Sequence, residues 1–282
     1  MFYSISHRIQ YAYSRAVFIE PCVLRLRPRS DCTQNLLRWE ARIDPTPAGR
    51  TEYVDLEGSS TTCAWFDGLH DSLSVSVESD VETLRENPFD FILADPAHAT
   101  LPVARNAHVS RALDPYRART QASEAVGAFA RALLDEASGE TLRFLSLLAR
   151  RMHEDFERVL RLEGDAWAAE RTLKDKGGAC RDLAVLFNDA CRSLGLPARF
   201  VSGYHEGDPD NPENDLHAWS EVYLPGGGWR GFDPTHGLAV ADRHIALTAA
   251  IEPGDAAPVT GAFRGTGAVS DMEHRVDVRP RP

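Results

Sequence analysis

A change in hydrophobic periodicity near residue 105 constrains the fold of this chain more than any other feature of its sequence. Up to that point apolar residues recur at every second position, for example from Leu37 to Ile43. This alternation is typical of strands that bury one face. Turn-forming stretches such as 44–49 separate the alternating segments, so residues 1–105 are expected to form a β-sandwich-like domain.

After Pro102 the apolar residues recur at spacings of three and four, which is the period of an amphipathic helix. We expect helices at about 121–137, around 145–156, and from 180 to 194. Strand-like segments then follow near 199–204, 217–224, 229–232 and 275–278. Helices followed by strands predict a second domain of α+β class over residues 106–282.

Composition narrows the choice of partners. The formal net charge is −11 and the isoelectric point is about 5.4, which disfavours binding to nucleic acid or to an anionic membrane. No apolar run is long enough to span a bilayer, so a cytoplasmic protein is expected. The five cysteines are scattered and lack the CxxC or Cys/His spacing of a zinc site. Reduced thiols, with no metal and no cofactor, are therefore predicted.

Cys180 stands at the opening of the third predicted helix, directly after the glycine pair 177–178. Free backbone N–H groups and the helix dipole at that end favour a thiolate over a thiol. With a protonated histidine nearby, such a cysteine has a pKa of roughly 3.5–7.5 instead of about 8.5. Cys180 is therefore the candidate nucleophile.

A thiolate nucleophile needs a proton carrier, and the carrier needs an acceptor on its other ring nitrogen. His217 begins one predicted strand and Asp233 ends the next, and the short connection 225–228 suits a hairpin. In an antiparallel pair the start of the first strand lies beside the end of the second. His217 and Asp233 are therefore expected to be neighbours.

Four segments resemble bacterial transglutaminase-like proteins with a papain-like core. They are Gly-Ala-Cys180-Arg-Asp-Leu-Ala, Leu-Gly-Leu-Pro-Ala-Arg-Phe-Val-Ser-Gly-Tyr204, His217-Ala-Trp-Ser-Glu-Val-Tyr and Trp229-Arg-Gly-Phe-Asp233-Pro-Thr. Upstream, Tyr11-Ala-Tyr and Cys22-Val-Leu-Arg-Leu-Arg-Pro28 resemble the β-rich N-terminal domain that accompanies this core in bacteria. The resemblance implies a nucleophile at Cys180, a general base and acid at His217, and an orienting carboxylate at Asp233.

The resemblance implies acyl chemistry directed at amides and leaves the acceptor open. We expect hydrolysis of peptide or carboxamide bonds through a thioester, with a peptide or protein amide as substrate, because the sequence shows no obvious secretion signal and no extra domain for docking large proteins. Transfer of the acyl group to an amine, as in a transglutaminase, is the first alternative. A non-catalytic peptide-binding module is the second, although such a module has no need of Cys180. The sequence leaves the oligomeric state open.

Other conspicuous residues have simpler interpretations. His236 and His205 are expected at the surface, and Cys191 in the core of the third helix. Asp182 suits the first turn of that helix through the dipole alone, although it could also orient the site. The acidic stretch 206–215 lacks the pattern of an EF-hand and is interpreted as a solvated turn. Trp219 and Trp229 could line a cleft or belong to the core with equal weight.

Overall fold

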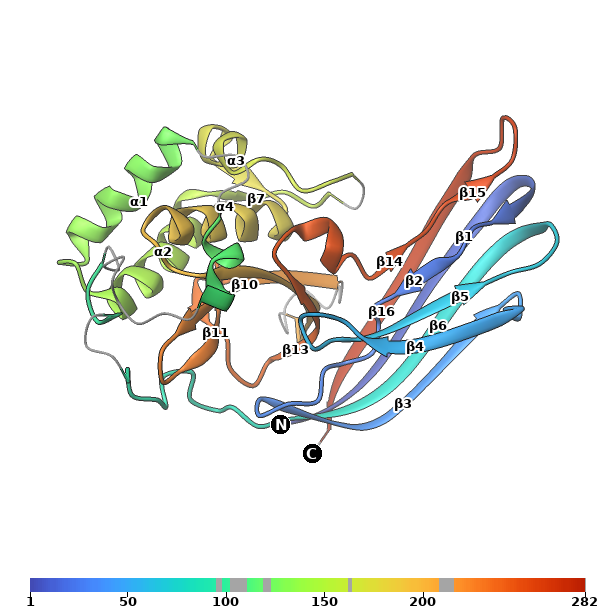
Figure 1. Ribbon diagram of the computed structural model, residues 1–282, viewed down its shortest axis with the longest axis horizontal. Helices are drawn as coiled ribbons and strands as arrows, with labels where there is room; N and C mark the ends of the chain where they lie inside the picture. Colours follow the sequence, from blue (N-terminus) through green and yellow to red (C-terminus); the bar gives the residue numbers. More distant parts are fainter. Residues whose placement is uncertain (95–97, 102–110, 119–122, 162–163, 208–215, 282) are drawn as a thin grey trace.

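The computed structural model describes residues 1–94, 98–101, 111–118, 123–161, 164–207 and 216–281. Figure 1 shows two parts side by side, a core of helices and sheet and a projecting stack of long strands. The α+β class and the sheet-rich N-terminal region predicted from the sequence are confirmed. The predicted division between residues 105 and 106, and most of the acidic stretch 206–215, lie outside the described residues.

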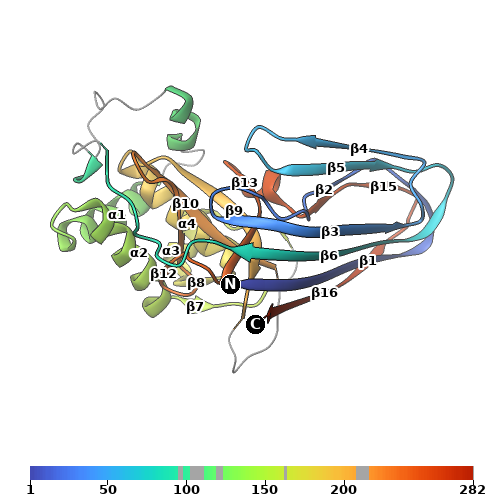
Figure 2. The same cartoon turned by 90° about the horizontal axis from the view of Figure 1, so that it is seen from below.

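The projecting part consists of two antiparallel sheets (Figure 2). In the first sheet, β1 lies between β6 and β16, β3 pairs with β6, and the short β15 extends the far end of β1. The second sheet has the order β14-β2-β5-β4. The bounds are β1 Phe2–Ile19, β2 Cys22–Leu24, β3 Gln34–Asp44, β4 Gly49–Val54, β5 Ser60–Trp65, β6 His70–Thr83, β14 Val259–Thr260, β15 Phe263–Arg264 and β16 Ser270–Arg281.

The C-terminal strands β14, β15 and β16 complete the N-terminal sheets. β16 pairs with β1 along almost its whole length, from Ser270 opposite Tyr13 to Arg281 opposite Phe2. This pairing brings the two termini together at the base of the stack (Figures 1 and 2). The range 106–282 assigned to the second domain from sequence therefore includes strands that pair with the first.

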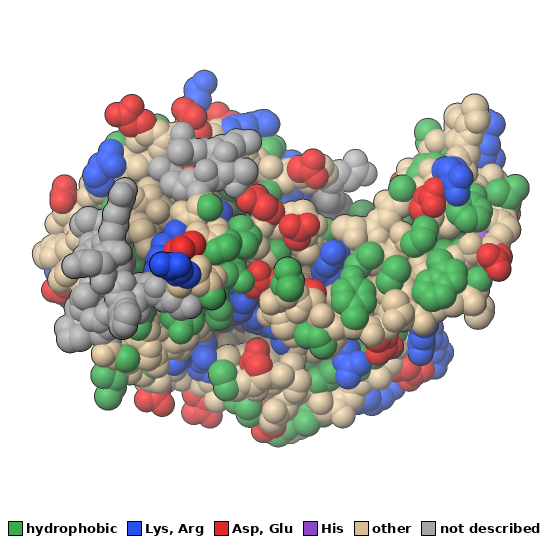
Figure 3. All heavy atoms as spheres, in the orientation of Figure 1, with side chains coloured by type: hydrophobic (Ala, Val, Ile, Leu, Met, Phe, Trp, Pro, Cys, Tyr) green, Lys and Arg blue, Asp and Glu red, His purple; other side chains and the backbone are tan. Residues whose placement is uncertain are grey.

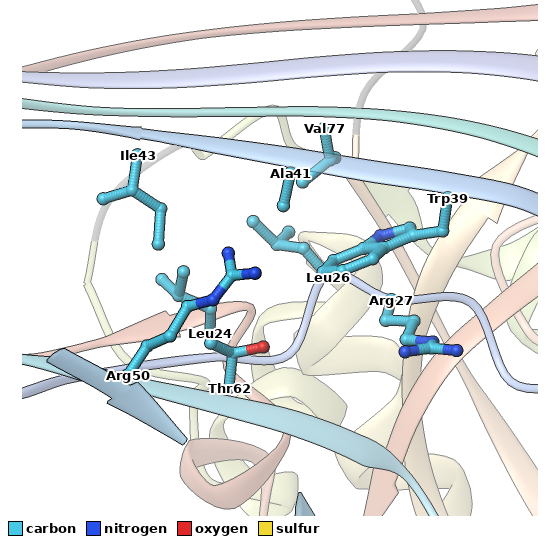
Figure 4. Close-up of a pocket in the computed structure, with 9 residues that line it drawn as sticks. All are labelled: Leu24, Leu26, Arg27, Trp39, Ala41, Ile43, Arg50, Thr62 and Val77. Atoms are coloured by element: carbon cyan, nitrogen blue, oxygen red, sulfur yellow. The ribbon is translucent and has the colours of Figure 1, made fainter. Parts of the chain in front are cut away.

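The interior of the sandwich is a packed apolar core. Figure 4 shows a gap in it, where nine side chains from the two sheets and the connection after β2 meet: Leu24, Leu26, Arg27, Trp39, Ala41, Ile43, Arg50, Thr62 and Val77. The cavity between them measures about 10 Å³, which is room for roughly one water molecule. The gap is too small to be a ligand site.

The core part is built on a sheet of order β12-β11-β10-β9-β13. Its strands are β9 Ala198–His205, β10 Leu216–Leu224, β11 Gly228–Asp233, β12 Leu238–Ala239 and β13 His244–Ala250. The helices are α1 Glu124–Glu136, α2 Thr141–Asp155, α3 Ala169–Asp175 and α4 Cys180–Ser193, and a short parallel pair joins β7 Glu157–Arg158 to β8 Gly177–Gly178. Short 3-10 turns lie before α1, at η2 Arg111–Leu113 and η3 Pro115–Arg117, and after β13, at η4 Pro253–Ala256.

The α4 helix packs against β10 and β9, and α1, α2 and α3 surround it. Its buried face includes Cys191, which confirms that this cysteine belongs to the core. The predicted helices and the strands of the central hairpin are present, whereas the sequence pattern did not indicate α3 or β13. Both are short, and β13 is buried on every residue, so it carries no alternation to recognise.

The opposite face of this sheet is covered by the sandwich. Tyr204, Ile245 and Leu247 belong to the same apolar cluster as the sandwich interior. The edge strand β13 is also capped, because the side-chain amide of Gln34 donates to the Ala246 carbonyl at 3.0 Å and accepts from its N–H at 2.8 Å. Satisfying the free edge of a sheet in this way prevents further strand pairing. The sandwich and this face of the core sheet therefore share one apolar cluster, which is separate from the cluster between the sheet and its helices.

Candidate active site

Cys180 is the first residue of α4, as the sequence predicts. Its thiol hydrogen-bonds His217 and accepts from the backbone N–H of Ala218. Burial by itself raises the pKa of Cys180, but the hydrogen bond and charge of His217, helped by the Ala218 N–H, hold that pKa below its usual 9.0. The start of α4 thus carries a thiol that is biased toward thiolate.

His217 links the thiol to a buried carboxylate. Its Nε2 lies 2.7 Å from Oδ2 of Asp233, and its other side meets Cys180. Burial alone would lower the pKa of His217, yet the charge and hydrogen bond of Asp233, together with Cys180, raise it to about 10. The structure therefore brings Cys180, His217 and Asp233 together, in the hairpin arrangement expected from β10 and β11.

Asp233 is fully buried and saturated with donors. Its Oδ1 accepts from the backbone N–H groups of Thr235 at 2.8 Å and His236 at 3.2 Å. Its Oδ2 accepts from His217, from Nδ1 of His236 at 2.8 Å and from Nε2 of His244 at 2.9 Å. Burial would raise the pKa of Asp233, but these imidazoles, His217 foremost, hold it well below 3.8. The carboxylate is therefore a permanent anion.

The histidines around Asp233 correct one expectation. His236 and His205 were predicted at the surface, but His236 donates to Asp233 and His205 stacks on His236 with ring centroids 4.2 Å apart. His244, which the sequence reasoning did not single out, lies opposite His205 across the β13–β9 pair. Only the position of His236, three residues after Asp233, could have signalled this cluster, because the other contacts depend on how β9, β13 and the turn after β11 meet.

Protonation is suppressed at two of the neighbouring rings, His244 and His205. Burial lowers the pKa of His244, and Nδ1 of this ring has no hydrogen-bond partner among the described residues. A proton on that nitrogen would be buried and unpaired, so His244 is neutral and donates from Nε2. Burial and the neighbouring histidines lower the pKa of His205 to about 2. His217, whose pKa is raised, is by contrast positively charged between Asp233 and Cys180.

His217, Asp233, His236 and His244 offer four ligand atoms within 4.8 Å of one another, a grouping that can hold a metal ion. The distances from Asp233 Oδ2 to the three nitrogens are 2.7, 2.8 and 2.9 Å. Ligands of a tetrahedral zinc ion, each about 2.0–2.1 Å from the metal, lie about 3.3 Å apart. The nitrogens converge on the carboxylate oxygen itself, so this geometry is that of a hydrogen-bonded cluster.

Asp182 does more than complement the helix dipole. Its Oδ2 accepts from the N–H of Ala179 at 2.8 Å, which caps α4 just before Cys180. Its Oδ1 accepts from the N–H of Trp167 at 2.7 Å and from Nη2 of Arg161 at 2.6 Å. The buried carboxylate therefore ties the loop around Arg161 and Trp167 to the start of the helix that carries the thiol.

Cys180 and His217 open on a cavity of about 650 Å³. Its walls come from the start of α4 and β10, from segments 158–161, 164–166 and 253–258, and from strands of the sandwich. On the face drawn in Figure 3 the surface is hollowed between the core and the projecting sandwich. Trp219 is buried and does not line this cavity, and Trp229 packs against Tyr116 and Tyr223. Neither tryptophan belongs to the walls.

Comparison with known families matches both parts of the chain. Residues 3–82 match the bacterial transglutaminase-like N-terminal region, and residues 128–234 match the transglutaminase-like superfamily. The second match spans Cys180, His217 and Asp233. A Cytophaga hutchinsonii protein solved as a candidate cysteine protease has the same fold, with a TM-score of 0.74 at 19% identity over 100% of this chain and 92% of its own.

Two curated proteins are similar to this chain to different extents. An uncharacterized protein of Mycobacterium leprae is 26% identical over 97% of both chains. A protein-glutamine gamma-glutamyltransferase of Pseudomonas aeruginosa is 33% identical over 124 residues, which is 39% of this chain and 18% of that protein. The chain therefore belongs to the transglutaminase-like superfamily and carries a bacterial transglutaminase-like N-terminal region.

Proposed function

We propose that this protein hydrolyses peptide or carboxamide bonds through a thioester on Cys180. The observation that carries the proposal is the hydrogen-bonded chain from Asp233 through His217 to Cys180, which opens on the large cavity. A lowered thiol pKa beside a raised imidazole pKa favours a thiolate–imidazolium pair. This pair is the resting state that cysteine acyl chemistry requires.

In the proposed reaction the Cys180 thiolate attacks the carbonyl carbon, and the carbonyl oxygen takes the negative charge. Backbone N–H groups at the start of α4 are the proposed donors to that oxygen. His217 then gives its proton to the departing nitrogen, the C–N bond breaks, and an amine or ammonia leaves a thioester behind. Water, deprotonated by His217, attacks the thioester and releases the carboxylic acid and Cys180. Asp233 holds the imidazole in orientation throughout.

Hydrolysis is preferred over amine transfer because solvent reaches the cavity. Arg158, Gly164 and Asp165, which line it, are exposed, so water has access to the thioester unless substrate excludes it. Transfer to an amine is the second candidate, favoured by the partial similarity to the glutamyltransferase of Pseudomonas aeruginosa. A peptide-binding module without catalysis is the third, and a reactive Cys180 would speak against it.

The first test is the reactivity of the thiol. Native protein is labelled with limiting iodoacetamide between pH 5 and 8, and each cysteine is followed by peptide mass. Cys180 should react rapidly near pH 6, where an ordinary thiol with a pKa of about 8.5 is almost wholly protonated. The exposed Cys32 is the internal reference, and the buried Cys22, whose pKa burial raises to about 11, should stay unlabelled.

Two variants test whether His217 activates the Cys180 thiol. His217→Ala should slow the labelling of Cys180 near pH 6 at least about tenfold, since the cation that favours the thiolate is lost. His70→Ala, which removes a half-buried histidine on the sandwich, is the matched control. Labelling of Cys180 no faster than that of Cys32 across this range would contradict the proposed function.

A second assay distinguishes the two acyl acceptors. Glutamine-containing peptides are incubated with and without a primary amine, and free acid and amide products are quantified by mass. Hydrolysis predicts mainly the acid, whereas transferase activity predicts incorporation of the amine.

The cytoplasmic location expected from the sequence stays a proposal. Among the described residues no helix is long and apolar enough to cross a membrane.

A further inference from the structure

One wall of the catalytic cavity comes from the sandwich. Four of its side chains lie on two paired strands, Ile9 and Tyr11 on β1 and Met272 and His274 on β16. Ile9 is opposite His274, and Tyr11 is opposite Met272. Because alternate residues of a strand point to the same side and directly paired residues share that side, these four form one continuous patch. We refer to it as the sandwich wall.

The sandwich wall is the exposed margin of an apolar core. Tyr11 and Met272 are half-buried and pack against the interior of the sandwich, as do Val259 and Leu216, which also line the cavity. The covered part of each side chain is held by that packing, and the uncovered part faces the cavity. Binding of an apolar ligand to such a surface is favourable, because it removes the water that covers the surface.

The nucleophile lies between this wall and a second apolar surface. Cys180 packs against a small cluster that includes Phe200, Ala218 and Ala256, each of which also lines the cavity. The arginines of the cavity, by contrast, lie in the segment 158–161 and at Arg181, outside the wall. Two of them are anchored within the protein, Arg161 to Asp182 and Arg181 to the Arg161 carbonyl at 2.7 Å.

We propose that the sandwich wall binds an apolar side chain, aromatic or branched aliphatic, that flanks the reacting carbonyl of the acyl donor. The inference rests on the proposed function and names its substrate class, a peptide with an apolar residue next to the bond that is attacked. A carboxylate or ammonium placed against Ile9 and Met272 would lose water without gaining a hydrogen-bond partner from either side chain. The N-terminal region then has a defined role, which is to select the substrate.

The test uses alkylating reagents, so it does not depend on turnover. Chloroacetamides that carry a phenethyl, an isobutyl or a carboxymethyl group on nitrogen are compared for their rate of labelling Cys180. Each rate is divided by the rate of the same reagent with glutathione. The corrected rate should be at least about tenfold higher for the phenethyl and isobutyl reagents than for the carboxymethyl reagent, consistent with burial of several methylene groups.

Variants on the two faces of β16 locate the effect. Met272→Ala and Tyr11→Ala should each reduce the apolar preference about three- to tenfold. Glu273→Ala is the matched control, because Glu273 is exposed and points away from the cavity face. Met272→Glu should instead favour an aminoethyl chloroacetamide, which keeps the proposal testable if a truncated side chain loosens the strand.

The outcomes separate this inference from the proposed function. Equal corrected rates for all reagents on the unaltered protein, or the same loss in Glu273→Ala as in Met272→Ala, would overturn the sandwich wall as a selectivity element, whatever the reactivity of the thiol. Slow labelling by every reagent, relative to Cys32, would overturn the activated thiol while leaving the ratio between reagents as a valid measure of the wall.

Discussion

Two buried carboxylates on the same sheet are stabilised as anions by different kinds of side chain. Glu221 on β10 lies at the contact with the sandwich, where Oε1 is 2.7 Å from Nη2 of Arg29 and Oε2 is 2.7 Å from Nη2 of Arg199. Asp233 on β11 lies at the candidate active site and accepts instead from three imidazoles. Burial would raise the pKa of Glu221, but the two guanidiniums lower it to about 2.

The difference between these partners is the mobility of the proton. Arginine does not lose its proton at any pH at which the protein is folded, so the charges around Glu221 are fixed. Arg199 also pairs with Glu57 at 2.9 Å, and this network ties the sandwich to the core. Imidazole can donate a hydrogen bond while neutral and can also carry a proton. The histidines therefore hold Asp233 in place and leave His217 able to deliver its proton.

The largest expected effect comes from Asp233→Asn. An amide cannot hold the His217 imidazolium, so acyl turnover should fall about three to four orders of magnitude. The NH2 group of the new amide would also face N–H donors, either at Thr235 or in the histidine cluster. This donor–donor contact should lower the free energy of unfolding by about 1–3 kcal/mol. Peptide turnover and urea unfolding measure the two effects, with Asp71→Asn on the sandwich as control. Turnover within tenfold of the unaltered protein would remove Asp233 from the mechanism.

The second effect concerns stability. Glu221→Gln removes the buried anion that Arg29 and Arg199 share and leaves them only Asp31, at 3.8 Å, and Glu57, at 2.9 Å. It should therefore lower the free energy of unfolding by about 3 kcal/mol. The matched control is Glu40→Gln, whose partners Arg38 and Arg42 are exposed, and which should leave the free energy of unfolding almost unchanged. In the folded variant, Cys180 should keep its labelling profile. Loss of thiol reactivity with full stability would show that the two carboxylates do not have separate roles.

The burial of Glu221 between its arginines also makes the stability of the protein depend on pH. The pKa of Glu221 is lowered in the folded state from 4.5 to about 2, so its stabilisation is complete above pH 4.5 and is lost as the pH falls from 4.5 toward 2. Urea unfolding at pH 6, 4 and 3 should show a steeper loss of stability in the unaltered protein than in Glu221→Gln. Parallel curves would contradict the fixed-charge interpretation.

The smallest effect is expected at His244, which we regard as a positioning residue. His244→Ala removes one donor from Oδ2 of Asp233 and should lower turnover about tenfold. It should also move the acid limb of Cys180 labelling to higher pH, because His217 is held less firmly. His244→Gln, whose Nε2 can donate from nearly the same place, should restore most of both. A variant that loses stability alone, with an unchanged pH profile, would make His244 merely structural.

Local sequence predicted part of this architecture well. The glycine pair before Cys180 indicated where α4 begins, and the short connection 225–228 indicated the hairpin that places His217 beside Asp233. These features depend on neighbouring residues, so pattern and turn chemistry suffice. His205 and His236 were misplaced for the opposite reason, since their ring stacking depends on how β9 and the turn after β11 meet in three dimensions.

The sequence by itself determined the class of the chain and the residues that come together at the thiol, because each belongs to a short element with its own signal. The tertiary structure alone decided the rest. It placed His244 against Asp233 through the pairing of β13 with β9, and it returned β16 to β1 so that Met272 and Tyr11 face the cavity. Long-range strand pairing is set by burial of the assembled sheets, and no local pattern encodes which distant strand a segment will join.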